Sequence, residues 1–246
     1  MIVKNRLLNF TDKIIYQNED YFAFSLDSVL LANFVTINLS DKKIVDFCTG
    51  NAPIPMLMSF RTKARIFGVE LQQEIYSMGY ESVLENKMDN QIELINADVN
   101  DIASVMDADS VDIVTCNPPY FKYQKDSLVN DNLIKTIARH EIMLNLEEIM
   151  KSSKYILKNG GTFAMVHRPD RMIEIINLMQ KYDIEPKKMR LVYPKFGKNA
   201  NILLIEGIKN GKTGLKVMAP LYTHNEDGSY VDEVRVMFGG IDDVAE

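Results

Sequence analysis

One apolar run in the sequence ends in an asparagine, two prolines and a tyrosine, in the stretch VTCNPPYFK at residues 114–122. Proline keeps the residue before it extended, and neither Pro118 nor Pro119 has an N–H to pair a carbonyl group of the loop. The side-chain oxygen of Asn117 and the carbonyl of Pro118 are therefore expected to be two fixed acceptors, which match the two protons of an exocyclic or carboxamide NH2 group. The nitrogen held in this way becomes nucleophilic as it loses planarity, and Tyr120 offers a ring face for stacking. The alternative is a plain loop that the prolines terminate.

Weaker chemical signals follow three other apolar runs. The turn DFCTGNAP contains Gly50, where the backbone can approach a ligand, but it lacks the G-x-G-x-x-G spacing of a dinucleotide site. Glu70 ends IFGVE, and its carboxylate suits the two hydroxyl groups of a ribose, although the helix dipole also favours an acid there. Asp98, or Asp101 in the same loop, could accept from an adenine amine or simply cap a helix. The turn, Glu70 and Asp98 each follow an apolar run, and this shared placement favours a single binding site.

Alternating strands and helices would bring these residues together. Apolar patterns predict strands at 43–48, 64–70, 91–96, 110–116 and 161–167, and helices at 54–61, 72–87, 143–157 and 170–181. This alternation predicts an α/β fold with a doubly wound, Rossmann-like, mostly parallel sheet, in which ligands bind beyond the carboxyl ends of the strands. Two more apolar runs, 189–194 and 200–209, predict an antiparallel C-terminal hairpin.

A single catalytic domain with a short N-terminal extension is expected from the length of 246 residues. Residues 42–246 would form the domain, and residues 1–41 would cap its ligand site. In the extension, YFAFSLDSVLLANFV predicts a helix with Asp27 as its N-cap. HNEDGS at 224–229 predicts a polar turn, and the amphipathic end of the chain after it gives no assignment.

Composition narrows the class of protein. The content of 46% hydrophobic and 25% charged residues is typical of a soluble globular protein, and no run approaches a membrane span or a signal-peptide core. Two cysteines are too few for a disulfide framework, so a cytoplasmic protein is expected, with Cys48 and Cys116 as small buried residues. The three histidines are separated from one another and from the cysteines, so no metal site is expected.

Charge is distributed unevenly along the chain. The net charge of −6 argues mildly against a nucleic-acid partner, because phosphate contacts require lysine and arginine. The segment PKKMRLVYPKFGKN at 186–199 nevertheless carries five basic residues and no acid. This segment is interpreted either as a local RNA-binding surface or as a solvated edge strand.

These motifs resemble those of a known family. DFCTGNAP, GVELQ, NADVND and NPPYF are similar, in this order, to the motifs of class I S-adenosylmethionine-dependent methyltransferases of the N6-adenine branch. FAFSLDSVLLANF, RHE, MVHRPDRM and APLYTHNEDGSYVDEV resemble the bacterial tRNA1(Val) adenine-37 N6-methyltransferase family, so that the likeness covers residues 10–238. The resemblance implies an enzyme that uses S-adenosylmethionine to methylate the N6 amine of adenine 37 in tRNA. The sequence does not determine the oligomeric state, and a monomer is favoured over an oligomer.

The resemblance also implies roles for particular residues. The target base would be held by Asn117, Pro118, Pro119 and Tyr120. The cofactor would be bound by residues of four strand ends and of the N-terminal extension: Asp46, Cys48, Thr49, Gly50 and Asn51 at its methionine part, Glu70 and Leu71 at its ribose, Asp98 and Val99 at its adenine, Asn117 beside the target base, and Phe24, Ser25 and Asp27 closing over it. Apart from the resemblance, Lys122, Arg139, His167, Arg168 and Lys195 could contact RNA, and for Lys122 and Arg139 a solvated surface position is the alternative.

The first turn departs from the family pattern D-x-G-x-G-x-G, because Cys48 and Ala52 stand where glycines are usual. Both residues are small, so a tighter pocket is expected. Two alternative functions remain open. One is a protein glutamine methyltransferase, whose carboxamide substrate also fits NPPY but whose relatives carry a larger helical segment before the first strand. The other is a cofactor-binding RNA-binding protein without turnover.

Overall fold

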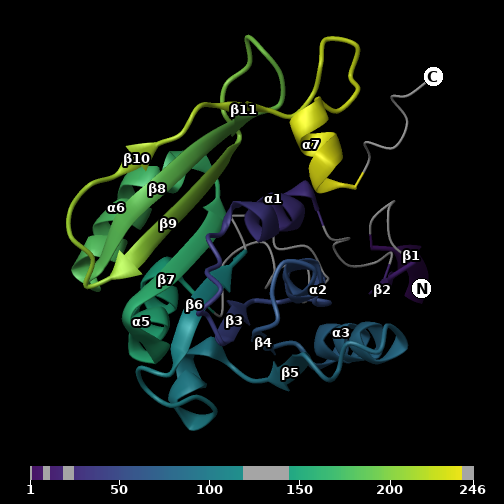
Figure 1. The fold of residues 1–246 in the computed structure, drawn as a ribbon, viewed down its shortest axis with the longest axis vertical. Coiled ribbons are helices and arrows are strands. Elements are labelled where there is room, and N and C mark those ends of the chain that lie inside the picture. The colour runs from purple at the N-terminus through teal and green to yellow at the C-terminus, as the bar shows by residue number, and fades with distance from the viewer. Residues whose placement is uncertain (1, 8–11, 19–24, 119–143, 240–246) are drawn as a thin grey trace, which may run out of the picture.

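Nine strands form one sheet in the part of the chain that the structure, a computed structural model, describes: residues 2–7, 12–18, 25–118 and 144–239. Five strands run parallel in the order β5 (Ile92–Asn96), β4 (Arg65–Glu70), β3 (Lys43–Phe47), β6 (Val111–Cys116) and β7 (Leu157–His167). Next come β9 (Ile202–Lys209), antiparallel to β7, and β8 (Ile184–Tyr193), antiparallel to β9. The short strands β10 (Lys216–Val217) and β11 (Leu221–Tyr222) pair parallel with β8. The predicted doubly wound α/β fold with antiparallel C-terminal strands is confirmed (Figure 1).

The direction of β8 decides where its carboxyl end lies. Because β9 is antiparallel to both β7 and β8, β8 runs in the same direction as the five parallel strands. Tyr193, the last residue of β8, therefore lies at the same edge of the sheet as the carboxyl ends of β3, β4 and β6. β11 runs beside this end, with Tyr222 in register with Tyr193.

Each face of the sheet carries its own hydrophobic core. Successive residues of a strand point to opposite faces, and accordingly Ile44 belongs to one core and Val45 to the other. Such strands are buried on both sides, which explains their near-continuous apolar runs. The first core includes residues of α1 (Leu26–Phe34), α2 (Pro53–Ser59), α3 (Gln73–Glu85) and α7 (Asp232–Met237). The second includes residues of the 3-10 helix η1 (Val99–Ser104), α5 (Leu146–Ile156) and α6 (Met172–Lys181).

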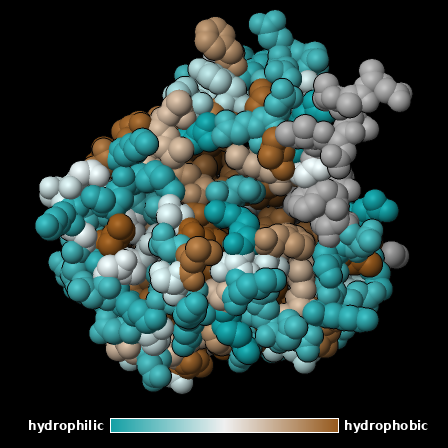
Figure 2. Space-filling model, in the orientation of Figure 1, coloured by the Kyte–Doolittle hydropathy of each residue, from teal (hydrophilic) through white to brown (hydrophobic). Residues whose placement is uncertain are grey.

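The outer surface is largely polar. Hydrophilic side chains cover much of the face seen in Figure 2, and hydrophobic side chains show through between them, among other places near its centre. In the described ranges, every helix falls short of the length or the apolar character that crossing a bilayer requires.

Several element boundaries differ from the prediction. β7 begins at Leu157, earlier than the predicted residue 161, and α6 begins at Met172, after the short 3-10 helix η2 (Pro169–Arg171). The predicted N-cap of α1 is wrong, because Ser25 occupies the cap position and Asp27 lies in the first helical turn. The unassigned end of the chain forms α7.

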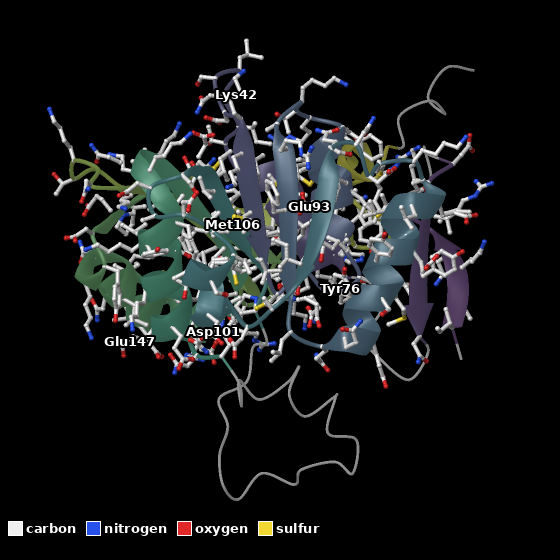
Figure 3. All side chains as sticks on the ribbon, turned by 90° about the horizontal axis from the view of Figure 1, so that it is seen from below. Lys42, Tyr76, Glu93, Asp101, Met106 and Glu147 are labelled. Atoms are coloured by element: carbon white, nitrogen blue, oxygen red, sulfur yellow. The ribbon has the colours of Figure 1, made fainter. Side chains whose placement is uncertain are left out.

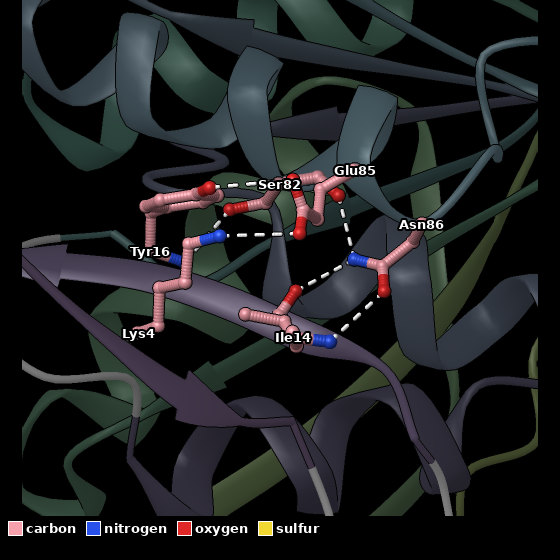
Figure 4. Close-up of polar contacts among 6 residues, drawn as sticks. All are labelled: Lys4, Ile14, Tyr16, Ser82, Glu85 and Asn86. Atoms are coloured by element: carbon pink, nitrogen blue, oxygen red, sulfur yellow. Dashed lines mark hydrogen bonds and ion pairs between the residues drawn. The ribbon is translucent and has the colours of Figure 1, made fainter.

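The N-terminal segment forms a two-stranded hairpin of its own. β1 (Ile2–Arg6) pairs antiparallel with β2 (Ile14–Asn18). Its β2 strand binds α3 through side chains of the helix (Figure 4). The backbone N–H of Tyr16 donates to Ser82 Oγ over 2.9 Å. Asn86 pairs with the backbone of Ile14 twice, accepting from its N–H at 2.9 Å and donating to its carbonyl at 2.6 Å. These bonds dock the hairpin on α3.

The segment after α1 is bound to the antiparallel strands. Glu206, buried on β9, accepts from the backbone N–H of Thr36 at 2.7 Å and from its hydroxyl at 2.9 Å. Lys188 on β8 lies 3.0 Å from the same carboxylate. The described part of residues 25–41 is therefore attached directly to the sheet.

Candidate functional site

The ends of the parallel strands define two edges of the sheet. Lys42, just before β3, lies at the amino edge, and Asp101, in η1 after β5, lies at the carboxyl edge (Figure 3). Ligands of open parallel sheets bind beyond the carboxyl edge. There β3 lies between β4 and β6. The turn after β3, Glu70 at the end of β4 and Asn117 after β6 are therefore neighbours.

Asp46 is buried in β3 next to this edge, with 0% of its surface exposed. Its Oδ1 accepts a hydrogen bond of 2.6 Å from the hydroxyl of Thr115 on the adjacent strand β6. Its Oδ2 has no partner among the described residues. Burial raises the pKa of Asp46 to about 7, and the nearby hydroxyl groups of Thr115 and Thr49 oppose this shift. A buried carboxylate with one unpaired oxygen is unfavourable unless a ligand supplies a donor or a positive charge.

The turn after β3 keeps a glycine-type backbone at three alternate positions. The φ angle is +55° at Cys48, +60° at Gly50 and +70° at Ala52. Glycine adopts this left-handed region freely, whereas a residue with a Cβ pays roughly 1–2 kcal/mol for it. The two replacements noted in the sequence have therefore changed the residue type but kept a left-handed backbone at those positions.

Glu70 links this turn to the next one. Its Oε2 accepts from the backbone N–H of Gly50 over 2.9 Å, and its Oε1 accepts from the N–H of Gln72 over 2.9 Å. Burial raises the pKa of Glu70, and the backbone hydrogen bonds from Gln72 and Gly50 oppose the shift. A carboxylate has about four acceptor sites, so the two bonds leave capacity for ligand hydroxyl groups.

The side chain of Thr49 occupies the space that Gly68 leaves open. A Cβ on Gly68 would lie 2.8 Å from Thr49 Oγ1 and 2.6 Å from Leu94 Cδ2. Thr49 is buried, and its Oγ1 has no partner among the described residues. A Cβ on Gly50 would meet no atom within 4 Å. Open space above Gly50 and unpaired oxygens on Asp46 and Thr49 fit a ligand that carries ammonium or hydroxyl donors, as the cofactor expected from the sequence does.

Asn117 is half-buried at the end of β6 and is followed by the buried Pro118. Its Nδ2 donates to the Oγ of Ser28 on α1 over 3.3 Å. Ser28 is buried, so α1 contacts the corner directly. With its nitrogen directed at Ser28, the amide has its oxygen on the other side, as an acceptor role requires. Pro119 and Tyr120 lie outside the described residues.

The N-terminal residues reach both parts of this edge. Asn51, in the turn after β3, donates from Nδ2 to the carbonyl of Tyr16 on β2 over 2.7 Å. Ser25 is exposed at the start of α1, and Asp27 is half-buried in the same helical turn. Phe24 lies outside the described residues. The hairpin and α1 therefore border the turn and the Asn117 corner respectively.

Asp98 caps a helix at the end of β5. Its Oδ1 accepts from the N–H of Asn100 over 2.8 Å, and η1 begins at the next residue, Val99. Asp98 thus caps η1, which is one of the two roles considered from the sequence, and its second carboxylate oxygen takes no part in this cap. Val99 is buried, while Asp101 and Leu71 are exposed. The residues expected at the ribose, Glu70 and Leu71, and those expected at the adenine, Asp98 and Val99, therefore all lie at the carboxyl edge of the sheet.

The predicted RNA-contacting residues differ in exposure. His167 is only 1% exposed, and its Nδ1 accepts from the N–H of Arg168 over 2.8 Å. This burial is at odds with a predicted RNA contact of His167, because the side chain does not reach the surface. Arg168 and Lys195 are exposed. Lys122 and Arg139 lie outside the described residues.

The strand part of the basic segment 186–199 is bound within the protein. Lys188 pairs with Glu206, and Arg190 donates to the carboxylate of Glu233 in α7. The exposed basic residues of this segment belong to the loop after β8. Among the described residues, no three His, Cys, Asp or Glu side chains gather as a metal site would require.

Two features of this edge escaped the sequence analysis. Ser28 lies within the quoted SLDSVLL motif, three residues after Ser25, but no local pattern pairs it with Asn117. Gly68 lies in GVELQ, where a glycine within a strand could have indicated a close approach. The cysteines are free, and Cys116 is buried as predicted, whereas Cys48 is half-buried.

Comparison with known proteins agrees with this geometry. The family model described as the methyltransferase small domain matches residues 24–183, which is more than half of the chain. The chain belongs to this family. It is accordingly a class I S-adenosylmethionine-dependent methyltransferase, and the resemblance found in the sequence is confirmed at that level.

Relatives of this methyltransferase have tRNA-related names. A protein of Bacteroides fragilis, named tRNA1(Val) (adenine(37)-N6)-methyltransferase, is 24% identical over 214 residues, which span 86% of this chain and 89% of the relative. A protein of the same name from Bacteroides thetaiotaomicron is 23% identical over 235 residues, spanning 94% and 96%.

Solved structures share the fold of this methyltransferase. A structure described as a predicted O-methyltransferase from Agrobacterium tumefaciens has a TM-score of 0.70 at 22% identity, over 87% of this chain and 95% of that one. Geranyl diphosphate C-methyltransferase from Streptomyces coelicolor has a TM-score of 0.56 at 13% identity, over 74% and 79%. At these identities the likeness concerns the fold alone.

Proposed function

We propose that this methyltransferase acts on the exocyclic N6 amine of an adenine in tRNA, at position 37 of the anticodon loop. The observation that carries the proposal is the position of Asn117. Its amide follows β6, beside the glycine-type turn after β3, and its nitrogen is engaged by Ser28. The names of the relatives support tRNA as the substrate.

The cofactor in this proposal is S-adenosylmethionine, which supplies an electrophilic methyl group on a sulfonium. The open space above Gly50 and the unpaired oxygens of Asp46 and Thr49 support a site for its methionine part. The remaining acceptor capacity of Glu70 supports a site for its ribose. The proposed cofactor-binding residues are those expected from the sequence: Phe24, Ser25, Asp27, Asp46, Cys48, Thr49, Gly50, Asn51, Glu70, Leu71, Asp98, Val99 and Asn117.

Asn117 and Pro118 would act on the adenine amine itself. Their two oxygens accept its two N–H groups, and these hydrogen bonds strengthen as the nitrogen loses planarity on the way to the transition state. Alignment of the nitrogen supplies most of the remaining advantage. A strong base is not needed, because the nitrogen becomes acidic once it is alkylated. Pro119 and Tyr120 would complete the corner.

A tRNA loop suits this arrangement. The target base must leave its stack to reach Asn117, and an unpaired loop permits this at low energetic cost. Arg168 and Lys195, together with Lys122 and Arg139, would contact phosphates, and the buried His167 has no part in the proposal. We place the protein in the cytoplasm, with its substrate, and as a monomer. Residues 1–41 would act as a cap over the cofactor.

Methyl transfer to purified substrates tests this proposal. The protein is incubated with methyl-labelled S-adenosylmethionine and total tRNA from cells that lack it, and the nucleosides are analysed by mass spectrometry. We expect label in N6-methyladenosine of one tRNA. A parallel incubation with release-factor protein tests glutamine as the acceptor. Label in protein and none in tRNA would overturn the RNA substrate, and cofactor binding without transfer to either would favour the alternative without turnover.

A further inference from the structure

The loop between β8 and β9 exposes a large aromatic side chain. Phe196 is 80% exposed in this loop. Isolated exposed apolar residues are common on protein surfaces and need no function. The surroundings of Phe196 are therefore what matters.

Phe196 belongs to a cluster of three rings. The centroids of Phe196 and Tyr222 lie 5.9 Å apart at an interplanar angle of 53°, and those of Tyr222 and Tyr193 lie 5.5 Å apart at 38°. Both distances fall in the range in which aromatic pairs attract each other. We call these three residues, Tyr193, Phe196 and Tyr222, the aromatic platform.

Backbone hydrogen bonds hold the platform in place. The N–H of Thr223 donates to the carbonyl of Tyr193 over 2.9 Å, and the N–H of His224 donates to the carbonyl of Pro194 over 3.0 Å. The base of the loop is closed by a bond of 3.0 Å from the N–H of Asn201 to the carbonyl of Val192. The β8–β9 loop and the segment after β11 thus leave the sheet together (Figure 1). A surface held in this way loses little conformational freedom when a ligand binds.

Charges of both signs surround the platform. Lys195 and Lys198 flank Phe196, and neither has an ion pair with a described residue. The turn 225–229 carries Glu226 and Asp227. Two lysines are complementary to a nearby phosphate, while the two acids limit the total attraction. Ring contacts, more than net charge, would therefore supply the affinity of a nucleic acid here.

We propose that the aromatic platform stacks an unpaired base of the RNA substrate. The choice of RNA as partner rests on the proposed function. Rings beside lysines are the surface that single-stranded nucleic acids use, because every base has a face that can stack on an aromatic side chain. Tyr193 ends β8 at the same sheet edge as Asn117, so one RNA loop can contact both.

The spacing along the sheet agrees with a single loop. β8 is separated from β6 by β9 and β7, which makes three strand spacings. At about 4.8 Å per spacing the two strands lie roughly 15 Å apart. This corresponds to about four stacking steps between nucleotides, at roughly 3.4 Å each. The stacked base would therefore belong to the same unpaired loop as the target adenine.

Binding of a labelled RNA stem–loop by the full chain tests the platform, with a fully paired duplex of the same stem as the comparison ligand. In Phe196→Ala we expect the affinity for the stem–loop to fall by roughly 5- to 150-fold, the range seen when a ring that stacks on a base is removed. Affinity for the duplex should stay unchanged. Phe196→Trp keeps a stacking face and should retain binding. The double variant Lys195→Ala/Lys198→Ala should lower the salt dependence of binding instead.

Matched controls come from the amino edge of the sheet. Leu39, before β3, is 102% exposed, and Lys63, before β4, is also exposed. Leu39→Ala and Lys63→Ala should leave binding to both RNAs unchanged. Because Phe196 is largely exposed, Phe196→Ala should fold normally, and its melting temperature checks this.

Unchanged stem–loop binding in Phe196→Ala would overturn the platform, and so would an equal loss for stem–loop and duplex. Light scattering separates a further outcome: if Phe196→Ala changes only the oligomeric state, the rings form an interface between copies and the proposal fails. Failure of the proposed function looks different, since the wild-type chain would then transfer no methyl group to tRNA. Stem–loop binding that depends on Phe196 would support the platform even in that case.

Discussion

The amide nitrogen of Asn117 donates to the hydroxyl of Ser28 over 3.3 Å and so joins the end of β6 to α1, a helix 89 residues earlier in the chain. An asparagine amide can turn either face toward a substrate, and only one of its faces accepts hydrogen bonds. In this structure the nitrogen side of the amide makes the contact with Ser28. The N-terminal segment is therefore part of the corner in which the proposed reaction takes place.

Ser28→Ala tests this contact. Removal of a neutral hydrogen bond of this kind changes free energy by about 0.5–1.5 kcal/mol, so we expect kcat to fall by roughly 2- to 10-fold with the KM for the cofactor unchanged. The control is Ser59→Ala in α2, whose hydroxyl only donates to the carbonyl of Met56 at 2.7 Å. Equal kcat values for both variants would show that Ser28 does not position Asn117.

Asn117→Ala removes the proposed acceptor itself. We expect kcat to fall on the order of 10²–10³-fold, as for loss of one preorganised hydrogen-bonding group in a transition-state site. Cofactor affinity, measured by calorimetry, should fall far less than kcat, because Asn117 is only one of many proposed contacts to the cofactor. Near-normal turnover of this variant would remove Asn117 from the reaction and leave the family membership untouched.

Glu70→Gln should weaken both the fold and cofactor binding. One oxygen of the glutamine side chain can still accept, but its NH2 group would face the N–H of Gly50 or of Gln72. A buried donor left without an acceptor costs about 1–3 kcal/mol, which chemical denaturation can measure. Glu93→Gln on the neighbouring β5 is the control, because Glu93 forms only an exposed pair with Arg65 at 3.0 Å, worth about 0–1 kcal/mol. Similar losses in the two variants would contradict a linking role of Glu70.

Asp46→Asn should change how stability depends on pH. Because burial raises the pKa of Asp46 from 3.8 to about 7, the folded chain holds a proton there that the unfolded chain releases near pH 4. The stabilisation by this proton is complete below about pH 4 and is lost as the pH rises through about 7. The free energy of unfolding of the wild type, relative to Asp46→Asn, should therefore fall between pH 4 and pH 7 by on the order of a few kcal/mol. Parallel pH curves for the two proteins would contradict the raised pKa.

The features that could be predicted from the sequence are those set by short stretches of residues, whereas contacts between distant segments could not be predicted. The parallel strands are buried on both faces, so each appears in the sequence as a short apolar run. The partner of Asn117 could not be predicted, because the bond to Ser28 depends on how α1 packs on the sheet. The two-residue strands β10 and β11 are too short to show a periodic pattern. Asp27 was predicted as the N-cap of α1 from its type, whereas the actual cap is set by where the chain first turns, at Ser25.

The left-handed backbone at Cys48 and Ala52 bears on how proteins of this kind diverge. A glycine with positive φ can be replaced only if the neighbouring strand and helix hold the same dihedral angles. After the replacement, the shape of the turn depends on this packing and no longer on the residue itself. Glycine counts then lose their value for detecting distant homologues. Patterns of backbone torsion angles persist after the residue types of the motif have changed. They should therefore detect more distant relationships among these proteins.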